Sequence, residues 1–399
     1  MGVAPPDARK RLLVLGAGPA QLGLLRAARG RGLRVVVCDR DAGAIGVRYA
    51  ERHAVVSVED EEGVEDVARA EGVEGLVAPG IDWPVAIAAR VAARLGLPHP
   101  VDPDTAAVVV SKHRQRDRFD AHGVPQPAWR LVSSSDVDAA LPCVVKPPDR
   151  QGQVAISLVR APTELRPALE AAIAASRSGS ALVEELVEGP EVTVNAFSVR
   201  GRFHSLTVTD RLTAEPPAFG VALAHVWPSE EAVETAVEAA RLAAEAVGVR
   251  DGPTYTQIRI GVDGPRVMEL AARLGGGHDA ELCEAALGID LNALALSAAL
   301  GRRVDVPDAR PAAGACVRFL VAPPGRLARV DGVREALQLE GVLDALPYRR
   351  PGWRFRPLRA GPDRAGFVLA RGGSRGEALA RAEAAAERIR FLVDAGDSS

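Results

Sequence analysis

Lysine is scarce in this chain, although basic residues are common. Of its 49 basic residues, three are lysines: Lys10, Lys112 and Lys146. An ammonium is a compact point charge on a thin stem, whereas the guanidinium of arginine is broad and planar. A lysine kept in mid-chain against so much arginine therefore indicates a closed pocket that binds phosphate. Chance survival of three lysines is the alternative, and only the surrounding motifs decide between the two.

Other scarcities exclude whole classes of protein. A net charge of −3 argues against a nucleic-acid binder that relies on a basic surface. The apolar stretches end well short of the ~18 residues of a membrane span, and the first residues contain neither a signal-peptide apolar region nor, with Pro6, a myristoylation context at Gly2. The four cysteines show no paired spacing, which is typical of reduced, buried thiols. We expect a soluble, cytoplasmic protein with no nucleic-acid or membrane partner.

Strand and helix patterns alternate along the first hundred residues. Strands are predicted at 12–15, 33–38, 54–58 and 75–78, with helical patterns between them. This alternation is typical of a parallel, doubly wound sheet. Three prolines at 98, 100 and 103 mark a boundary near residue 105.

The middle of the chain is denser in strands. They are predicted at 143–146, 154–159, 181–184, 191–199 and 202–209, with one helix at about 163–177. Such a run favours a small α+β subdomain within a larger protein. A Pro-containing loop is expected at 216–228, then a long helix at about 229–247, two strands around a D-G-P turn, and helices near 279–288, 290–300 and 376–393.

A glycine-containing turn follows the first strand. Gly16-Ala17-Gly18-Pro19-Ala20-Gln21 opens a helix, and Asp39 ends the second strand, where a dinucleotide site places its ribose-binding acid. The third glycine of that motif is missing, since Gln21 stands there. We therefore favour a tight turn whose helix N-terminus can meet a substrate anion over NAD binding.

Two segments have the composition of a nucleotide site. Lys146 ends an apolar strand and precedes P-P-D-R-Q-G-Q, a loop whose backbone N–H groups can close over phosphates. Residues 181–191, A-L-V-E-E-L-V-E-G-P-E, join a strand to an acidic linker that can meet the edge of an adenine and ribose hydroxyls. An ordinary surface hairpin and solvated acids are the alternatives.

An acid on a late strand suits metal and phosphoryl chemistry. Glu269 lies in V-M-E-L-A-A-R-L-G-G-G-H, on a strand that pairs through a D-G-P turn with the strand of Gln257. A carboxylate that faces a cleft beside Arg273 and Gly275–Gly277 suits magnesium and a transferred phosphoryl group. A buried acid paired with Arg273 is the alternative.

Taken in order from residue 12 to about 390, these segments resemble the ATP-grasp superfamily of carboxylate–amine (or carboxylate–thiol) ligases. The branch with L-amino-acid ligases looks closest, and biotin carboxylase and the carboxyaminoimidazole synthases are more distant. The resemblance implies an α/β ATP-grasp fold in three parts: an N-terminal domain (1–105), an ATP-grasp domain (106–305, with a lid at about 113–203) and a C-terminal lobe (306–399). By analogy with the family, a homodimer is plausible.

The resemblance also implies the site residues. Those for ATP are Lys112, Lys146, Gln151, Gly152, Gln153, Glu184, Glu185, Leu186, Val187, Glu191 and His225. Those for Mg²⁺, which Mn²⁺ can replace, are Glu269 and Gln257, and those for catalysis are Arg273, Lys146 and Arg211. Gln257 stands where the family usually has an acid, and Ala271 where it often has Asn; the lost charge should weaken metal binding.

The implied reaction has two steps. ATP phosphorylates a small carboxylate, and an amine then displaces phosphate from the acyl phosphate to form an amide, with ADP and phosphate as by-products. Two alternatives stay open: an enzyme of this fold that activates bicarbonate, and a nucleotide-binding protein without catalysis. Substrate pockets could include His53, Asp82, Trp83 and His278, although packing roles explain these residues as well.

Overall fold

Four β-sheets organise the chain, and the computed structural model describes them over residues 10–394. The N-terminal sheet is parallel, in the order β3-β2-β1-β4. Its strands are β1 (Arg11–Leu15), β2 (Arg34–Cys38), β3 (Arg52–Ala54) and β4 (Leu76–Val77). Its helices are α1 (Leu22–Gly30), α2 (Glu61–Glu71) and α3 (Trp83–Leu95), and short 3₁₀ turns lie at Pro19–Gln21 and Val47–Tyr49.

Helices cover both faces of this sheet, so its inner strands are apolar throughout. Leu12 and Val14 pack in one core with α1, whereas Leu13 and Leu15 pack in another with α2 and α3. The predicted doubly wound domain architecture is thus present in these residues. The strand expected at 54–58 is wrong: β3 ends at Ala54, because the chain turns there to leave the edge of the sheet, and Val55 is 63% exposed.

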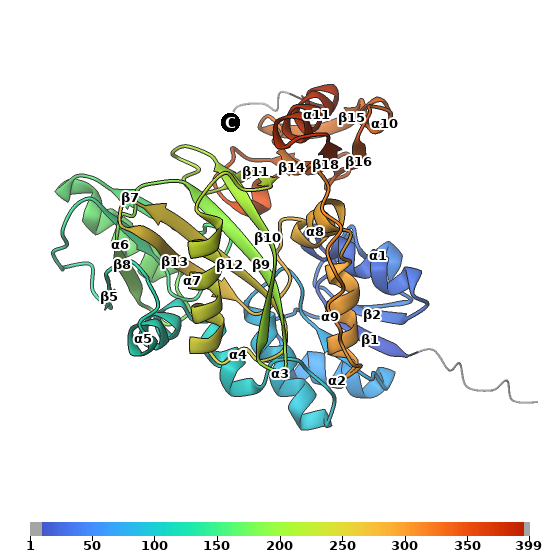
Figure 1. Cartoon of the computed structure of the whole chain (residues 1–399), viewed down its shortest axis with the longest axis horizontal. Helices are drawn as coiled ribbons and strands as arrows, with labels where there is room; N and C mark the ends of the chain where they lie inside the picture. Colours follow the sequence, from blue (N-terminus) through green and yellow to red (C-terminus); the bar gives the residue numbers. More distant parts are fainter. Residues whose placement is uncertain (1–9, 395–399) are drawn as a thin grey trace, which may run out of the picture.

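The largest sheet has eight strands and is antiparallel throughout, in the order β13-β12-β9-β10-β11-β14-β18-β16. Its strands are β9 (Glu191–Val199), β10 (Arg202–Thr213), β11 (Ala222–Trp227), β12 (Gly252–Gly261), β13 (Gly264–Ala271), β14 (Gly314–Leu320), β16 (Val342–Pro347) and β18 (Gly366–Gly372). Helix α7 (Val233–Ala246) lies against β9, β10, β12 and β13 (Figure 1). Ala236, Ala239, Ala240 and Ala243 form its buried stripe at helical spacing.

One strand of this sheet lies where the sequence predicts a loop. The range 216–228 contains β11, which pairs with β10 on one side and β14 on the other. Its segment, A-L-A-H-V-W, is poor in β-branched residues, so strand propensity gave little signal, and the pairing with two neighbours decides the conformation.

A smaller antiparallel sheet, β5-β8-β6-β7, is covered by one helix. Its strands are β5 (Trp129–Val132), β6 (Cys143–Lys146), β7 (Ser157–Val159) and β8 (Ala181–Glu185), and the helix is α6 (Pro162–Ala175). The predicted small α+β subdomain therefore exists, but β9 and β10, expected within it, belong to the eight-stranded sheet. Helices α4 (Pro103–Val109) and α5 (Lys112–His122) connect the N-terminal sheet to it.

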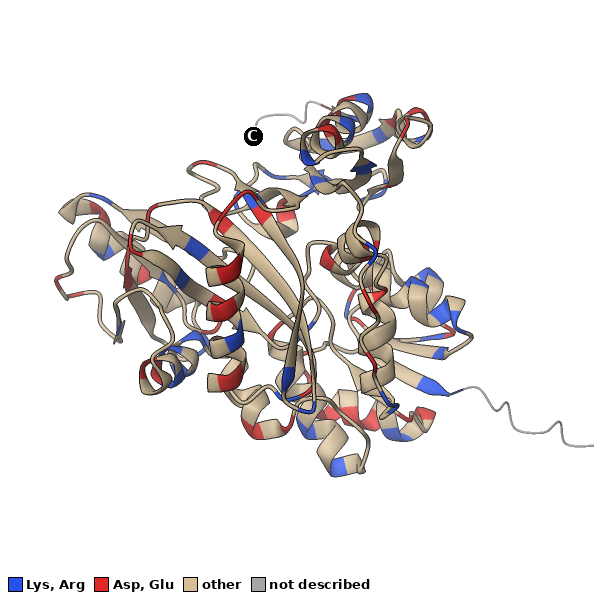
Figure 2. Cartoon of the chain, in the orientation of Figure 1, with Lys and Arg blue, Asp and Glu red and all other residues tan. Residues whose placement is uncertain are grey.

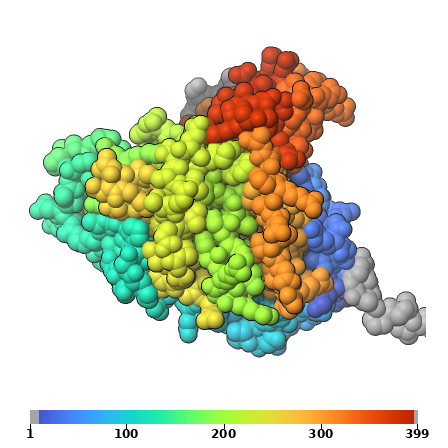
Figure 3. Space-filling view, in the orientation of Figure 1, coloured from blue at the N-terminus to red at the C-terminus, as the bar shows by residue number. Residues whose placement is uncertain are grey.

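The C-terminal residues form a cap. A three-stranded sheet, β17-β15-β19, and helix α11 pack against β14 and β18, and the cap lies above the other parts in Figures 1 and 3. Its elements are β15 (Gly325–Asp331), α10 (Val333–Leu337), β17 (Arg354–Phe355), a 3₁₀ turn (Gly361–Asp363), α11 (Arg375–Arg388) and β19 (Arg390–Asp394). Helices α8 (Asp279–Leu287) and α9 (Leu291–Ala299) fill the space between the large sheet and the N-terminal domain.

Charges of both signs are interspersed over the outer helices in Figure 2. Among the described residues, no helix is both long and apolar enough to cross a bilayer.

Candidate functional site

Two adjoining cavities lie where the small sheet β5-β8-β6-β7, the large sheet and the N-terminal sheet meet. The first contains about 740 Å³ of space and the second about 1120 Å³, part of it open to solvent in each case. Five residues line both: Gln151, Gly152, Gln153, Gln257 and Glu269. A group bound in one cavity can therefore meet a group bound in the other beside Glu269.

The first cavity contains both mid-chain lysines. Lys112 begins α5, and its Nζ lies 2.9 Å from Glu269 Oε2 and donates to Arg150 O at 2.6 Å. Burial alone would lower the pKa of Lys112, but the nearby carboxylates, Glu269 first, raise it above its ordinary value. Lys112 therefore stays charged in a buried position, as a phosphate-binding lysine must.

Lys146 is held by a buried carboxylate. It ends β6, and its Nζ lies 2.7 Å from Oε2 of Glu184 on the paired strand β8, while Oε1 of Glu184 accepts from Arg116 Nε at 2.9 Å. Burial would raise the pKa of Glu184, but the two cations outweigh it and lower that pKa. Burial and the neighbouring cations Arg116 and Lys112 lower the pKa of Lys146 despite Glu184. Glu184 thus orients the lysine, and it does not line either cavity.

The glycine-containing loop after β6 closes over both cavities. Its base is fixed by Asp149, whose carboxylate accepts from the backbone N–H groups of Arg177 and Ser178 at 2.9 and 2.8 Å. Its tip contacts both other parts of the chain: the side chain of Gln151 accepts from the backbone N–H of Asp82, and Gly152 O accepts from Gly361 N at 2.9 Å. Gly152 has φ +70°, a conformation that glycine adopts without strain. This loop is therefore placed to cover a bound nucleotide.

The linker after β8 forms another wall of the first cavity. Leu186, Val187 and Glu191 line it, whereas Glu185 is exposed. Glu191 is ion-paired with Arg211 Nε at 3.1 Å and with Arg259 at 3.3 Å. An apolar linker with an acid at its end can contact an adenine and a ribose, as the sequence predicts.

Gln257 and Glu269 face each other across the predicted hairpin of β12 and β13, where a bulge between Gln257 and Ile258 shifts the register by one residue. Gln257 Nε2 donates to Glu269 Oε1 at 2.8 Å. Burial would raise the pKa of Glu269, but Lys112 and other cations lower it to about 2, so the carboxylate is ionised. One carboxylate and one amide oxygen, reached by turning the amide, fit a single Mg²⁺ that takes its other ligands from phosphates and water. Among residues 10–394, no group of three His, Cys, Asp or Glu residues could hold a metal ion.

Arginines dominate the second cavity. Arg273 Nε donates to Asp82 Oδ1 at 2.7 Å, and its guanidinium lies 5.3 Å from the centre of the Tyr255 ring. Arg211 donates to the hydroxyl of Tyr255 at 2.9 Å. Arg364, from the C-terminal cap, lines the same cavity. The lining therefore favours an anionic ligand.

A buried histidine completes this cavity. His225 on β11 lies with Nδ1 3.0 Å from Asp279 Oδ1 and is 2% exposed. Burial would raise the pKa of Asp279, but His225 and the Gly277 N–H lower it to about 2. His225 lines the second cavity and not the first, so its predicted contact with the nucleotide lacks support from the cavity geometry.

The turn after β1 lines the second cavity too. Asp39 Oδ2 accepts from Ala17 N at 2.8 Å, Gln21 Oε1 accepts from Gly18 N at 2.9 Å, and Gln21 Nε2 donates to Pro79 O at 2.6 Å. Asp39 thus fixes the turn instead of offering itself to a ribose, in keeping with the tight turn that we favoured over a dinucleotide site.

Most predicted site residues therefore converge on the two cavities, and several important ones were missed. Arg116 follows Lys112 by one helical turn, a spacing that could have found it. Tyr255, Asp279 and Arg364 belong to no motif. Of the four residues named for a substrate pocket, Asp82 binds Arg273, Trp83 lies under Arg177, His53 bonds to Asp39 O, and His278 stacks on Phe367.

Comparisons with known proteins agree with this geometry. Residues 139–281 match the ATP-grasp domain family, and residues 318–394 match the L-amino acid ligase C-terminal domain 2 family. The chain is similar to the crystal structure of L-amino acid ligase from Bacillus licheniformis, with a TM-score of 0.82 and 22% identity over 97% of this chain and 100% of that one.

Two curated relatives are similar in sequence. Uncharacterized protein y4rH of Sinorhizobium fredii is 28% identical over 320 residues, which cover 76% of this chain and 65% of that protein, so the chain spans slightly less than two thirds of this relative. Formate-dependent phosphoribosylglycinamide formyltransferase of Burkholderia lata is 27% identical over 411 residues, covering 98% of this chain and 97% of that protein.

The fold and the two family matches define an ATP-grasp protein. Residues 139–281 thus form an ATP-grasp domain, and residues 318–394 form a domain of the L-amino acid ligase C-terminal type. The predicted resemblance to ATP-grasp proteins and the predicted fold class are confirmed. ATP-grasp enzymes use ATP and Mg²⁺.

Proposed function

We propose that this protein joins a small, amino-acid-like carboxylic acid to an amine at the expense of ATP, through an acyl phosphate, and releases ADP and phosphate. The observation that carries the proposal is the position of Glu269: it borders both cavities and contacts Lys112 on the nucleotide side. The L-amino acid ligase domain over residues 318–394 supports amino-acid-like substrates.

The first cavity would bind ATP. Leu186 and Val187 offer apolar contacts and backbone groups to the adenine, and Glu191 offers a carboxylate to the ribose. Lys112 and Lys146 would bind the phosphates, since both are buried ammonium groups that line this cavity. Glu269 and Gln257 would hold Mg²⁺, which neutralises phosphate charge when bound.

The second cavity would bind the acid and the amine. Transfer of the terminal phosphoryl group to the acid carboxylate, followed by attack of the amine, develops negative charge on oxygen at both steps. Arg273 and Arg211 lie on this side of Glu269 and can stabilise that charge, because their positions are fixed by Asp82, Glu191 and Tyr255 before any substrate binds. The closed loop at Gly152 would exclude the water that hydrolyses an acyl phosphate.

Two substitutions test the proposal. Glu269→Ala and Lys146→Ala should each abolish ATP-dependent product formation while the circular dichroism spectrum stays that of a folded protein. Glu170→Ala, which removes an exposed carboxylate from α6, is the control and should retain full turnover. Retained turnover in both site variants would contradict the assignment.

A further inference from the structure

Arg364 is a cation of the second cavity that has no acidic partner among residues 10–394. Its Nε donates to Gly361 O at 2.9 Å, and its guanidinium carbon lies 3.8 Å from the centre of the Phe319 ring. These contacts fix the plane of the guanidinium. They leave its two terminal nitrogens, Nη1 and Nη2, without an acceptor in the described part of the chain.

Two other arginines that line the second cavity differ in this respect. Arg211 is ion-paired with Glu191, and Arg273 is ion-paired with Asp82. Asp363, next to Arg364 in the sequence, accepts instead from the backbone N–H groups at 359 and 360. Arg349 also lines this cavity and has no ion pair in the described part of the chain, so the cavity contains more positive charge than its fixed acids pair.

Withdrawing a cation from water without a counter-ion is unfavourable. Burial lowers the pKa of Arg364 and the proximity of Arg211 lowers it further, and the opposing effects of Tyr348, Tyr255 and Asp279 do not restore it. An anionic ligand would relieve the imbalance. The planar fork of a guanidinium matches a carboxylate or a phosphate.

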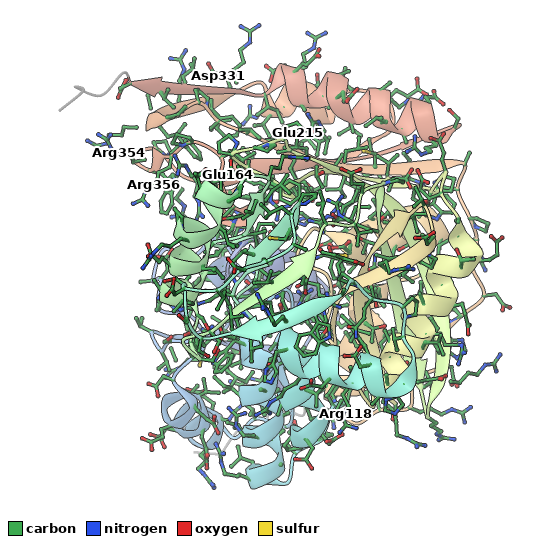
Figure 4. All side chains as sticks on the ribbon, turned by 90° about the vertical axis from the view of Figure 1, so that its left-hand side faces the viewer. Arg118, Glu164, Glu215, Asp331, Arg354 and Arg356 are labelled. Carbon is green, nitrogen blue, oxygen red and sulfur yellow. The ribbon has the colours of Figure 1, made fainter. Side chains whose placement is uncertain are left out.

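Location decides between these two anions. Arg364 lines the second cavity and not the first, where Lys112 and Lys146 face the proposed phosphates. Arg354 and Arg356, from the same cap, are exposed and lie at its edge in Figure 4, so basic residues of the cap do not share one orientation. The guanidinium of Arg364 is therefore placed to meet an anion in the second cavity, which would hold the acid and the amine.

We propose that Arg364 anchors a free carboxylate on a substrate, distinct from the carboxylate that becomes phosphorylated. This inference rests on the proposed function and narrows its substrate class: either the acid is a dicarboxylate, or the amine is itself an amino acid whose carboxylate survives in the product. In either case, the group that the guanidinium of Arg364 would bind is a carboxylate.

Calorimetric binding tests the proposal. The protein is first saturated with Mg²⁺ and a non-hydrolysable ATP analogue, and the affinity for the analogue is recorded. It is then titrated with the common amino acids, their α-amides, succinate, and glutarate. Wild type, Arg364→Gln and Arg364→Lys are compared, with Arg356→Gln as the matched control from the exposed face of the cap.

We expect at least one carboxylate-bearing compound to bind wild type, and to bind Arg364→Gln about 10- to 100-fold more weakly, the effect of losing a charge-assisted, bidentate pair. Arg364→Lys, which keeps the charge and loses the fork, should lie between them, and Arg356→Gln should match wild type. If the amino acids bind and their α-amides do not, the carboxylate belongs to an amino acid; if only succinate or glutarate binds, it belongs to a dicarboxylic acid.

Results that contradict the role of Arg364 differ from results that contradict the proposed function. Equal binding of every compound to wild type and both Arg364 variants, equal binding of acids and amides, or no binding of any compound despite a bound nucleotide would each overturn the anchor. Failure of the ATP analogue to bind wild type would instead overturn the proposed function. Should Arg364→Gln unfold, Arg364→Lys supplies the same comparison.

Discussion

Replacing Glu184 by glutamine tests how the nucleotide cavity holds its lysine. Glu184 is 1% exposed, and its two carboxylate oxygens lie 2.9 Å from Arg116 Nε and 2.7 Å from Lys146 Nζ. Glutamine keeps the shape of the side chain and removes its charge. The buried cations Arg116 and Lys146 would then have lost the carboxylate that neutralises them.

The expected loss of stability is large. Removing one partner of a buried ion pair costs about 3–5 kcal/mol, because the other charge is left uncompensated. We therefore expect Glu184→Gln to lower the free energy of unfolding by about 4 kcal/mol. Adding Lys146→Met removes one of the two uncompensated cations, so the double variant should be more stable than the sum of the single variants by more than about 1 kcal/mol.

Urea denaturation without nucleotide measures the free energies of unfolding. Titration with an ATP analogue measures nucleotide affinity, which depends on whether Lys146 keeps its position. Glu184→Gln should weaken analogue binding, since Lys146 loses the group that orients it. Glu170→Gln, an exposed change, should alter the free energy of unfolding by less than about 0.5 kcal/mol. A loss below about 1 kcal/mol for Glu184→Gln, together with unchanged nucleotide affinity, would refute the reasoning.

Three further predictions concern charge and the loop. Gln257→Glu should lower the Mg²⁺ concentration that half-saturates ADP release by roughly tenfold, because one more negative charge within about 4 Å of a divalent cation contributes more than about 1 kcal/mol; an unchanged Mg²⁺ titration would count against Gln257 as a metal neighbour. The pKa of Asp279 is about 2 in the folded state and about 3.9 in an unfolded chain, so its ionisation stabilises the fold above pH ~4 and this contribution is lost as the pH falls through ~2. Urea unfolding from pH 5 to 2 should accordingly show wild type losing about 2–3 kcal/mol more than Asp279→Asn, and parallel curves would contradict this. Gly152→Ala places a side chain at φ +70° and should slow turnover several-fold without changing the secondary structure seen by circular dichroism; full turnover would show that the loop need not adopt this conformation.

The sequence alone predicted those features of the fold and the site that depend on residues close together in the chain. The scarcity of lysine pointed to Lys112 and Lys146, and the structure places both in the first cavity. The D-G-P turn predicted the hairpin, whereas the pairing of Gln257 with Glu269 also depends on a bulge between Gln257 and Ile258 that shifts the register by one residue. The alternating strands and helices before residue 105 predicted the parallel sheet, because a helix between two strands lets both run in the same direction.

The rest depends on contacts between distant segments. Arg273 meets Asp82 across 191 positions in the sequence, and no local pattern predicts such a partner. The family resemblance assigned Glu184 to the nucleotide, whereas in the structure its carboxylate contacts Lys146 and Arg116 and is their counter-ion. β11 was missed because its residues form a strand only between β10 and β14. Arg364 lies in no motif, and only its place in the second cavity singles it out.

The most direct test of the account is the release of ADP and phosphate from Mg·ATP against an array of carboxylic acids and amines, singly and in pairs, with and without bicarbonate. The account predicts that ADP and phosphate appear in equal amounts when an acid and an amine are both present, together with a product whose mass equals their sum less one water. Release of AMP and pyrophosphate, release that depends on bicarbonate alone, or nucleotide binding without turnover on any pair would contradict it.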